Sequence, residues 1–286
     1  MRRRFHPAEA VMGGFFVLCG LVAVAFVLVI SLYLILAGLP AIRTIGLWDF
    51  LLGREWDAAG PDPRFGILPF LLASVYGAAG AIVLGAPVGL LCAVFLAKIA
   101  PPKLAAAVRP AVEVLSGIPS VVYGLVGMLA LVPAVRKWFS LPDGACLLSA
   151  ILVLAVMILP TVIAVSESAL KAVPPEYEAA SLALGATEIE TVFRVSLPAA
   201  SSGVAAAVVL GVGRALGEAM AVLMVAGNGA NMPGLFQSVR FLTTAVAGEM
   251  AYAAGLQRQA LFSIALVLFL FILLINGVLT ALLKKR

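Results

Sequence analysis

Long apolar stretches alternate with short charged segments along the whole chain. No charged residue occurs in 10–42, 65–97, 114–135, 144–166 or 259–283, and Arg214 and Glu218 are the only charges within 195–239. A helix needs about 20 apolar residues to cross the hydrocarbon core of a bilayer. The pattern therefore predicts an all-α integral membrane protein, one transmembrane domain over 1–286, with six helices near 12–37, 69–97, 113–134, 146–169, 201–227 and 259–283.

Composition supports this class and excludes others. The chain is 63% hydrophobic and 12% charged, with a mean hydropathy of +1.15, which is outside the range of soluble domains. The net charge of +5 comes largely from basic residues beside the apolar stretches, so it indicates membrane orientation rather than nucleic-acid binding. Cys19 and Cys92 lie in predicted spans, and no disulfide framework is indicated.

The distribution of basic residues predicts the orientation. Arg2, Arg3 and Arg4 precede an apolar run that is much longer than the core of a cleaved signal peptide, so we expect an uncleaved signal anchor. Lys and Arg are more numerous on the side of the membrane that holds this N-terminus. The positive-inside rule then places both termini and the segment 171–198 in the cytoplasm.

The segment 178–198 carries charged and polar residues although it lies between apolar stretches. Pro174 and Pro175 suit the start of a helix, and a small-to-apolar face recurs at helical spacing from Tyr177 to Leu184. We expect Gly185 to end this helix. In a membrane protein, a helix that lies outside the bilayer in this way is typical of a segment that binds a partner protein.

A second helix is predicted directly after it. Thr187 followed by Glu190 forms the pattern of a capping box, in which each residue satisfies a backbone N–H near the other. An apolar stripe follows, and Pro198 is expected to stop the helix.

Several kinds of catalytic site are absent from the sequence. No Gly-Lys dipeptide occurs, which excludes a P-loop, and there is no GxSxG nucleophile motif. The only histidine, His6, lies in the N-terminal tail, so we expect no metal centre and no histidine-based catalysis. Energy from ATP must therefore come from another subunit.

Arg214 and Glu218 lie within the predicted fifth span. Charges at the centre of a membrane helix are costly, and the expected spacing of four residues places both on nearly the same face. They would then line a cavity, where Arg214 binds a passing oxyanion and Glu218 orients the guanidinium. The structural alternative is an ion pair that only makes the span insertable. Small residues nearby favour close helix packing or a hinge: Gly203, Gly211, Gly213 and Gly217.

The start of the third span is also unusual. Pro119 lies between Gly117 and Ser120, which predicts a broken or kinked entry to the helix. We expect Glu113, just before it, to have a capping or packing role at the inner interface.

Five segments together resemble the phosphate ABC importer permeases of the PstC type. They are GREW (53–56), FGILPFL (65–71), RPAVEVLSGIPSVVYGLVG (109–127), the EAA segment that begins at Glu178, and GRALGEAMAV (213–222). The EAA segment by itself marks an ABC importer, and the other segments indicate the phosphate permeases. The resemblance implies the type I permease fold with a cytoplasmic EAA coupling loop.

The resemblance also implies partners and site residues. The expected assembly contains a second permease of the PstA type, two copies of a PstB-type ATPase that uses ATP and Mg²⁺, and a periplasmic phosphate-binding protein of the PstS type. It is expected in the bacterial inner membrane. Arg214 and Glu218 would serve phosphate passage, and the residues coupled to the ATPase would be Glu178, Ala179, Ala180 and Gly185. Ala219 departs from the threonine expected after this glutamate.

The predicted function is a permease subunit that exposes a central path by alternating access and has no catalytic activity of its own. No cofactor is expected on this chain. Three alternatives stay open: the same machine carrying sulfate, molybdate or an organic solute; a gated anion channel; and an intramembrane enzyme that uses carboxylates.

Overall fold

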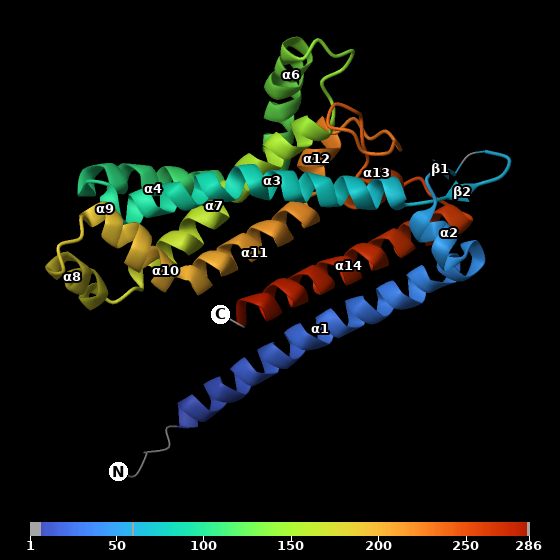
Figure 1. Ribbon diagram of the computed structural model, residues 1–286. Coiled ribbons are helices and arrows are strands. Elements are labelled where there is room, and N and C mark those ends of the chain that lie inside the picture. Colours follow the sequence, from blue (N-terminus) through green and yellow to red (C-terminus); the bar gives the residue numbers. More distant parts are fainter. Residues whose placement is uncertain (1–6, 59, 285–286) are drawn as a thin grey trace.

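The computed structural model describes residues 7–58 and 60–284, and nearly all of its regular structure is helical (Figure 1). A short hairpin of two antiparallel strands, β1 and β2, pairs Trp56 with Phe65. The elements in chain order are α1 (Pro7–Ile45), α2 (Leu47–Leu52), β1 (Trp56–Asp57), β2 (Arg64–Phe65), α3 (Leu68–Val94), the π-helical turn η1 (Phe95–Ile99), α4 (Pro102–Gly117), α5 (Ser120–Val126), η2 (Gly127–Leu131), α6 (Val132–Trp138), α7 (Leu147–Lys171), α8 (Pro175–Ala183), α9 (Glu188–Thr191), η3 (Val192–Ser196), α10 (Leu197–Ala199), α11 (Ser201–Gly217), α12 (Met220–Val225), α13 (Leu242–Glu249) and α14 (Gly255–Lys284).

The core forms where α3, α7 and α11 pack together. Glycines on α3 allow a close approach to α7. A Cβ atom added to Gly85 would lie 2.8 Å from the Ala155 carbonyl oxygen, and one added to Gly89 would lie 2.9 Å from Cγ1 of Val162. Larger residues there would force the two helices apart, so these positions determine the spacing of the central pair.

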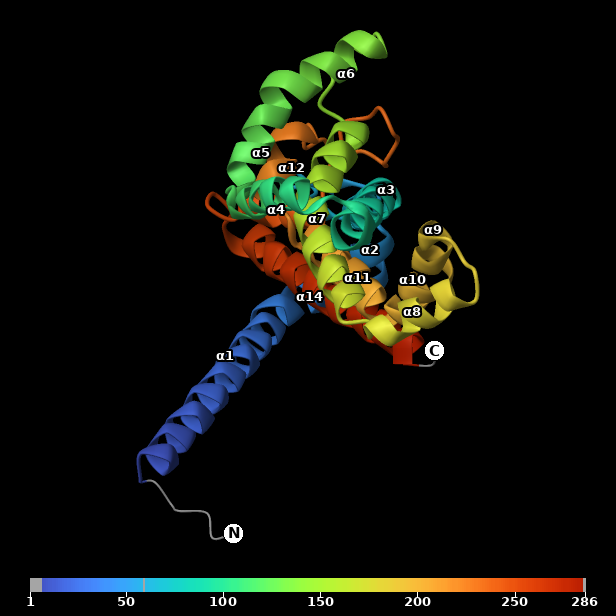
Figure 2. The ribbon, with the colours of Figure 1, turned by 90° about the vertical axis from the view of Figure 1, so that its left-hand side faces the viewer.

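Helices α1 and α14 run side by side in opposite directions along one flank of the core (Figure 1). Their contact is close at Gly38, whose carbonyl oxygen accepts a hydrogen bond of 2.5 Å from Ser263 Oγ. The first half of α1 stands away from the rest of the molecule, with apolar side chains exposed along its length (Figure 2). Such a surface is suited to lipid or to another membrane protein.

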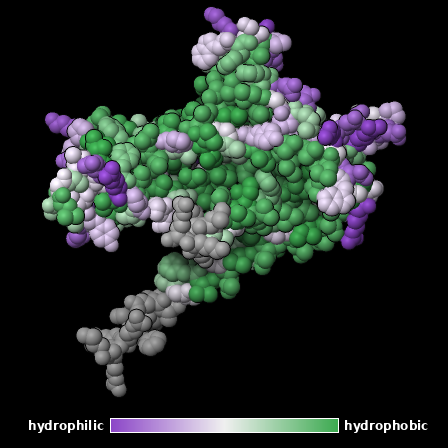
Figure 3. Space-filling model, in the orientation of Figure 1, coloured by the Kyte–Doolittle hydropathy of each residue, from purple (hydrophilic) through white to green (hydrophobic). Residues whose placement is uncertain are grey.

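Five helical stretches of the described residues are long and apolar enough to cross a membrane: Met12–Ile45, Leu68–Ile99, Ser120–Trp138, Leu147–Lys171 and Gly255–Ala281. A sixth arises if the pair Glu188–Ala199 and Ser201–Gly217, bent by 71°, counts as one span. The six-span prediction therefore agrees with the structure only when this bent pair is counted, and Ser201–Gly217 is the part of it that overlaps the predicted fifth span. Figure 3 shows a broad apolar surface with polar residues gathered at its extremities.

Two predicted spans differ from the helices that form. The third begins at Ser120 rather than near 113, because α4 ends at Gly117 and Pro119 separates it from α5. The fifth, predicted as 201–227, is not one continuous helix, since α11 ends at Gly217 and α12 begins at Met220. The basic residues Arg2, Arg3 and Arg4, with His6, Lys285 and Arg286, lie outside the described residues.

Candidate functional site

The polar segment folds as the predicted helix, turn and helix, comprising α8, α9, η3 and α10. Helix α8 follows Pro174, and the turn after it contains Gly185 at φ +88°, a left-handed conformation that favours glycine. Ala179 and Ala180 are exposed on α8. The expectation that Gly185 ends the first helix is therefore confirmed.

The second helix starts with the predicted capping box. The Glu190 backbone N–H donates to Thr187 Oγ1 at 3.3 Å, and the Thr187 backbone N–H donates to Glu190 Oε2 at 3.0 Å. The latter hydrogen bond lowers the pKa of the Glu190 carboxyl below its ordinary value. The predicted stop at Pro198 is displaced by one residue: Pro198 lies inside α10, which ends at Ala199, and the chain bends there.

The Glu178 carboxylate has two polar partners within its own chain. Its Oε1 atom accepts a hydrogen bond of 2.7 Å from Ser196 Oγ and forms an ion pair with the Lys98 ammonium of η1. Burial raises the pKa of this carboxyl, but Lys98 and Ser196 lower it by more, and the pKa is below its ordinary value. Sequence reasoning found Glu178 but missed Lys98, because no local pattern relates residues 80 positions apart.

Five large apolar side chains of the same segment are exposed, and we call them the coupling surface. They are Tyr177 (55% exposed), Leu182 (45%), Leu184 (90%), Ile189 (65%) and Phe193 (44%). They occur on both helices and on the turn between them. An exposed apolar group on an otherwise polar segment is typical of a protein-docking surface.

The second predicted site lies where α11 gives way to α12. Glu218 has an extended backbone, with ψ 126°, and its Oε1 accepts a hydrogen bond of 3.0 Å from the Ala221 backbone N–H. The expectation that Arg214 and Glu218 share one helix face is therefore wrong. Gly217 weakens the last turn of α11, and the Glu218 side chain offers the backbone an alternative hydrogen bond that starts a new helix. Ala219, beside it, has no side-chain oxygen that could do this.

Arg214 is partly exposed, and its side chain contacts a neutral hydroxyl. Its Nη1 atom lies 3.4 Å from Thr161 Oγ1 on α7, a long hydrogen bond to a neutral group. No carboxylate among the side chains that the structure describes, those of residues 12–58 and 60–281, forms an ion pair with it. The guanidinium thus keeps a positive charge and free donors close to the middle of the chain's apolar region.

The break between α4 and α5 lies next to the break between α11 and α12. A Cβ atom on Gly124 of α5 would lie 2.8 Å from the Ala221 Cα atom of α12, so the two short helices touch. The Tyr123 hydroxyl donates a hydrogen bond of 2.7 Å to the Leu115 carbonyl oxygen near the end of α4, and it lies within electrostatic range of Arg214. The broken entry predicted at Pro119 is confirmed. The interrupted pairs α4–α5 and α11–α12 therefore pack against each other.

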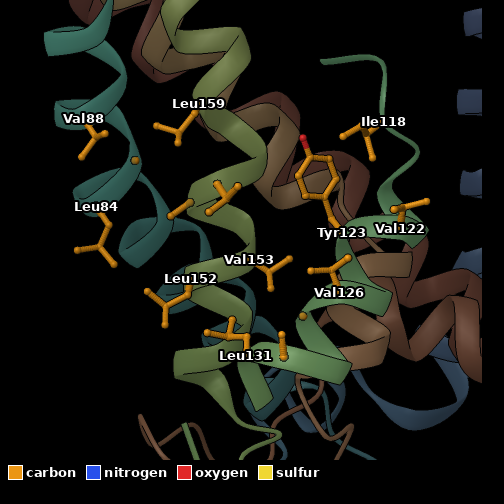
Figure 4. A pocket seen from close by; sticks show the side chains of 15 residues that line it. Leu84, Val88, Ile118, Val122, Tyr123, Val126, Leu131, Leu152, Val153 and Leu159 are labelled. Carbon is orange, nitrogen blue, oxygen red and sulfur yellow. The ribbon is translucent and has the colours of Figure 1, made fainter. Parts of the chain in front are cut away.

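A groove between α3, α5 and α7 has a different character. It has a volume of about 660 Å³, and its lining is apolar except for Tyr123. Figure 4 shows the side chains of Leu84, Leu152 and Leu159 around it. Neither Arg214 nor Glu218 lines this groove, so it is unsuited to an inorganic anion.

Two further polar clusters were missed at the sequence level. Glu167 on α7 accepts from Arg109 Nε at 2.7 Å and from Lys171 Nζ at 2.6 Å, beside a small cavity that the exposed Glu113 also lines. Lys171 follows Glu167 at helical i,i+4 spacing, a local signal that could have been noticed, whereas Arg109 is brought there by the fold.

The other cluster centres on Glu249 at the end of α13. Its carboxylate accepts from Trp56 Nε1 at 3.2 Å and from Gln257 Nε2 at 3.0 Å, and it pairs with Arg240. The Arg240 guanidinium also lies over the Phe70 ring, 5.6 Å from its centroid. This network joins the hairpin to α13 and α14. No group of three potential ligands that could hold a metal ion occurs in the described part of the chain.

Comparison with known sequences gives consistent matches. The family described as "Binding-protein-dependent transport system inner membrane component" matches residues 85–286. The "Probable ABC transporter permease protein YqgH" of Bacillus subtilis is 38% identical over 267 residues, covering 90% of this chain and 86% of the relative. The "Phosphate transport system permease protein PstC" of Pasteurella multocida is 32% identical, covering 84% of this chain and 83% of the relative.

Solved structures share the fold. A chain of a bacterial alginate ABC transporter, crystallised with an alginate-bound periplasmic protein, aligns with a TM-score of 0.62 at 14% identity, covering 97% of this chain and 95% of that chain. A chain of the inward-facing MetNI methionine ABC transporter aligns with a TM-score of 0.59 at 23% identity, covering 77% and 94%. At these identities the likeness concerns architecture alone.

Proposed function

Because this chain belongs to the family of binding-protein-dependent transport system inner membrane components, we propose that it is one of two permease subunits of an ATP-driven importer of inorganic phosphate. It forms half of a path across the membrane and performs no catalysis. A separate ATPase of the PstB type binds Mg²⁺ and hydrolyses ATP. The sister permease is of the PstA type, and a periplasmic binding protein of the PstS type delivers phosphate.

The observation that carries this proposal is the Arg214 guanidinium in the last turn of α11, just before the break to α12, with no ion pair among the described side chains. Backbone at a helix break and a cation with free donors together suit an oxyanion better than a neutral solute. The long contact to Thr161 leaves this cation available, since a neutral hydroxyl at 3.4 Å is a weak competitor for it. Phosphate is supported as the oxyanion by the PstC relatives, of which one is 32% identical over most of the chain.

The coupling surface supports the partnership with an ATPase. Its apolar side chains are exposed although the segment around them is polar, which is the condition for docking into another protein. The described ends of α1 and α14 lie toward the same end of the molecule as α8, which is consistent with cytoplasmic termini (Figure 1). In the bacterial inner membrane, movement of the ATPase would then shift α8 to α10 and open the path alternately to the two sides.

The test is transport by the complete complex in proteoliposomes. We expect labelled phosphate to accumulate only when ATP, the ATPase and the loaded binding protein are all present. Flux of phosphate without ATP would identify an anion channel instead. Uptake of sulfate, molybdate or an organic solute in place of phosphate would indicate an ATP-driven importer with a different substrate. Catalytic activity of the isolated chain would indicate an enzyme.

A further inference from the structure

We propose that Thr243 of α13 is a positioning residue of the anion path, because its hydroxyl holds the interruption between α11 and α12 in place. The interruption keeps the Glu218 carboxylate off the helix face that carries Arg214. This inference rests on the proposed function, since it explains how the cation assigned to phosphate is kept without a counter-charge.

The Glu218 carbonyl oxygen has a partner from a distant segment of the chain. Thr243 Oγ1 donates a hydrogen bond of 2.8 Å to this oxygen across 25 positions of sequence, and Thr243 is only 8% exposed. The last carbonyl groups of a helix have no partner within it, and lipid offers none. Ala219, the next residue, has no hydroxyl that could serve, so the donor comes from α13.

A continuous helix is the competing arrangement of this segment. There the Glu218 carbonyl oxygen would accept from the Val222 backbone N–H, four residues on, and the Glu218 carboxylate would lie on nearly the same face as the Arg214 guanidinium. Opposite charges at that spacing attract strongly in a medium of low dielectric constant. The resulting pair would occupy the guanidinium. The Thr243 hydroxyl binds the same carbonyl oxygen and so favours the interrupted form.

Helix α13 can support this hydroxyl because both of its ends are anchored. At its start, the Leu242 backbone N–H donates to Ser74 Oγ of α3 at 3.0 Å. The Phe241 ring lies so close to α3 that Gly77 has no room for a Cβ atom. At its other end, the Glu249 network joins α13 to the hairpin and to α14. The donor is therefore held at a defined place beside the interruption.

Phosphate uptake and amide exchange in the complete complex test this role. Thr243→Val keeps the shape of the side chain but removes the donor. The maximal rate of uptake should fall about fivefold, the effect of losing one neutral hydrogen bond. The phosphate concentration for half-maximal uptake should stay the same, because the binding protein captures the phosphate. Hydrogen exchange of amides 218–222 should become slower, since the helix becomes continuous.

Two further variants separate the hydroxyl from the general integrity of α13. Thr243→Ser keeps the donor and should recover uptake to within about twofold of the unaltered complex. Thr244→Val is the matched control, with the same substitution at the next buried position, where the hydroxyl bonds the backbone of Phe241. It should leave both uptake and the exchange of amides 218–222 unchanged.

Several outcomes would overturn the inference. They are normal uptake by Thr243→Val, an equal loss in Thr244→Val, and faster exchange of amides 218–222, which would mean that the segment loosens instead of becoming continuous. If Thr243→Val does not assemble, as judged by size-exclusion chromatography, Thr243→Ala replaces it, and normal uptake by that variant rejects the role. Absence of phosphate uptake by the unaltered complex would reject the proposed cargo instead, and amide exchange in the Thr243 variants would still decide the role of the hydrogen bond.

Discussion

Glu178 and Arg214 are both charged residues that the sequence indicates as functional, yet their surroundings in the structure differ in charge. Glu178 is matched by Lys98 within its own chain and is further bonded to Ser196. Arg214 meets only the neutral Thr161 hydroxyl, and no described carboxylate pairs with it. A charge that its own fold already neutralises is suited to holding elements together. One without a counter-charge is available to a charged substrate.

The largest effect should come from Arg214→Ala. A hydrogen bond to a charged group contributes about 1.5–3 kcal/mol, so phosphate uptake should fall at least about tenfold. The check is the initial rate of uptake across a range of phosphate concentrations, with expression and assembly measured in parallel. Arg136→Ala, an exposed arginine on α6, is the control with the same charge change. Normal uptake by Arg214→Ala would remove the contrast between the two residues.

Substitution of Glu218 separates a structural role from a role in the path. Glu218 accepts a hydrogen bond at the start of α12, and a glutamine retains such an acceptor whereas an alanine does not. If the role is capping, Glu218→Gln should transport normally, and Glu218→Ala should lose roughly 1 kcal/mol of local stability, with uptake reduced several-fold. Equal loss of uptake in both variants would show that the negative charge itself is needed.

A smaller effect is expected for Thr187→Ala in the coupling segment. Loss of the capping oxygen should weaken the start of α9 by about 1 kcal/mol, equivalent to roughly fivefold more frequent local opening. Hydrogen exchange of the amides of residues 188–196 measures this, with Glu188→Gln as a control that leaves the box intact. Unchanged exchange would mean that packing of η3, rather than the cap, holds this helix.

The smallest effect concerns pH. The pKa of Glu178 is lowered in the folded chain, so the stabilisation by this pair is fully present above the ordinary pKa of about 4.5 and is lost as the pH falls through the lower folded value. A fluorescent probe on Leu184→Cys should therefore report no change between neutral pH and that ordinary value, and a change only in stronger acid. A Glu178→Gln variant should lack this transition. A transition near neutral pH would contradict the assigned pairing.

Local signals predicted the coupling segment well and the fifth span poorly. Gly185 and the Thr187–Glu190 box act within one turn of chain, so their effects can be recognised without knowing the neighbours. The interruption after Gly217 accompanies packing of α12 against α5, where Gly124 allows close contact with Ala221. Hydropathy treats 201–227 as one apolar stretch because it carries no information about this contact.

The sequence by itself determined that the chain is a membrane protein, where three of its six apolar helices lie to within a few residues, and which charged segment stands apart from them. These properties depend on transfer of side chains into lipid and on hydrogen bonds between near neighbours, and both are functions of short stretches. Only the tertiary structure decided which charges are paired. Lys98 meets Glu178, and Arg109 meets Glu167, because helix ends far apart in the chain fold together. The same folding leaves Arg214 without a carboxylate, since the break after Gly217 turns Glu218 to the start of α12.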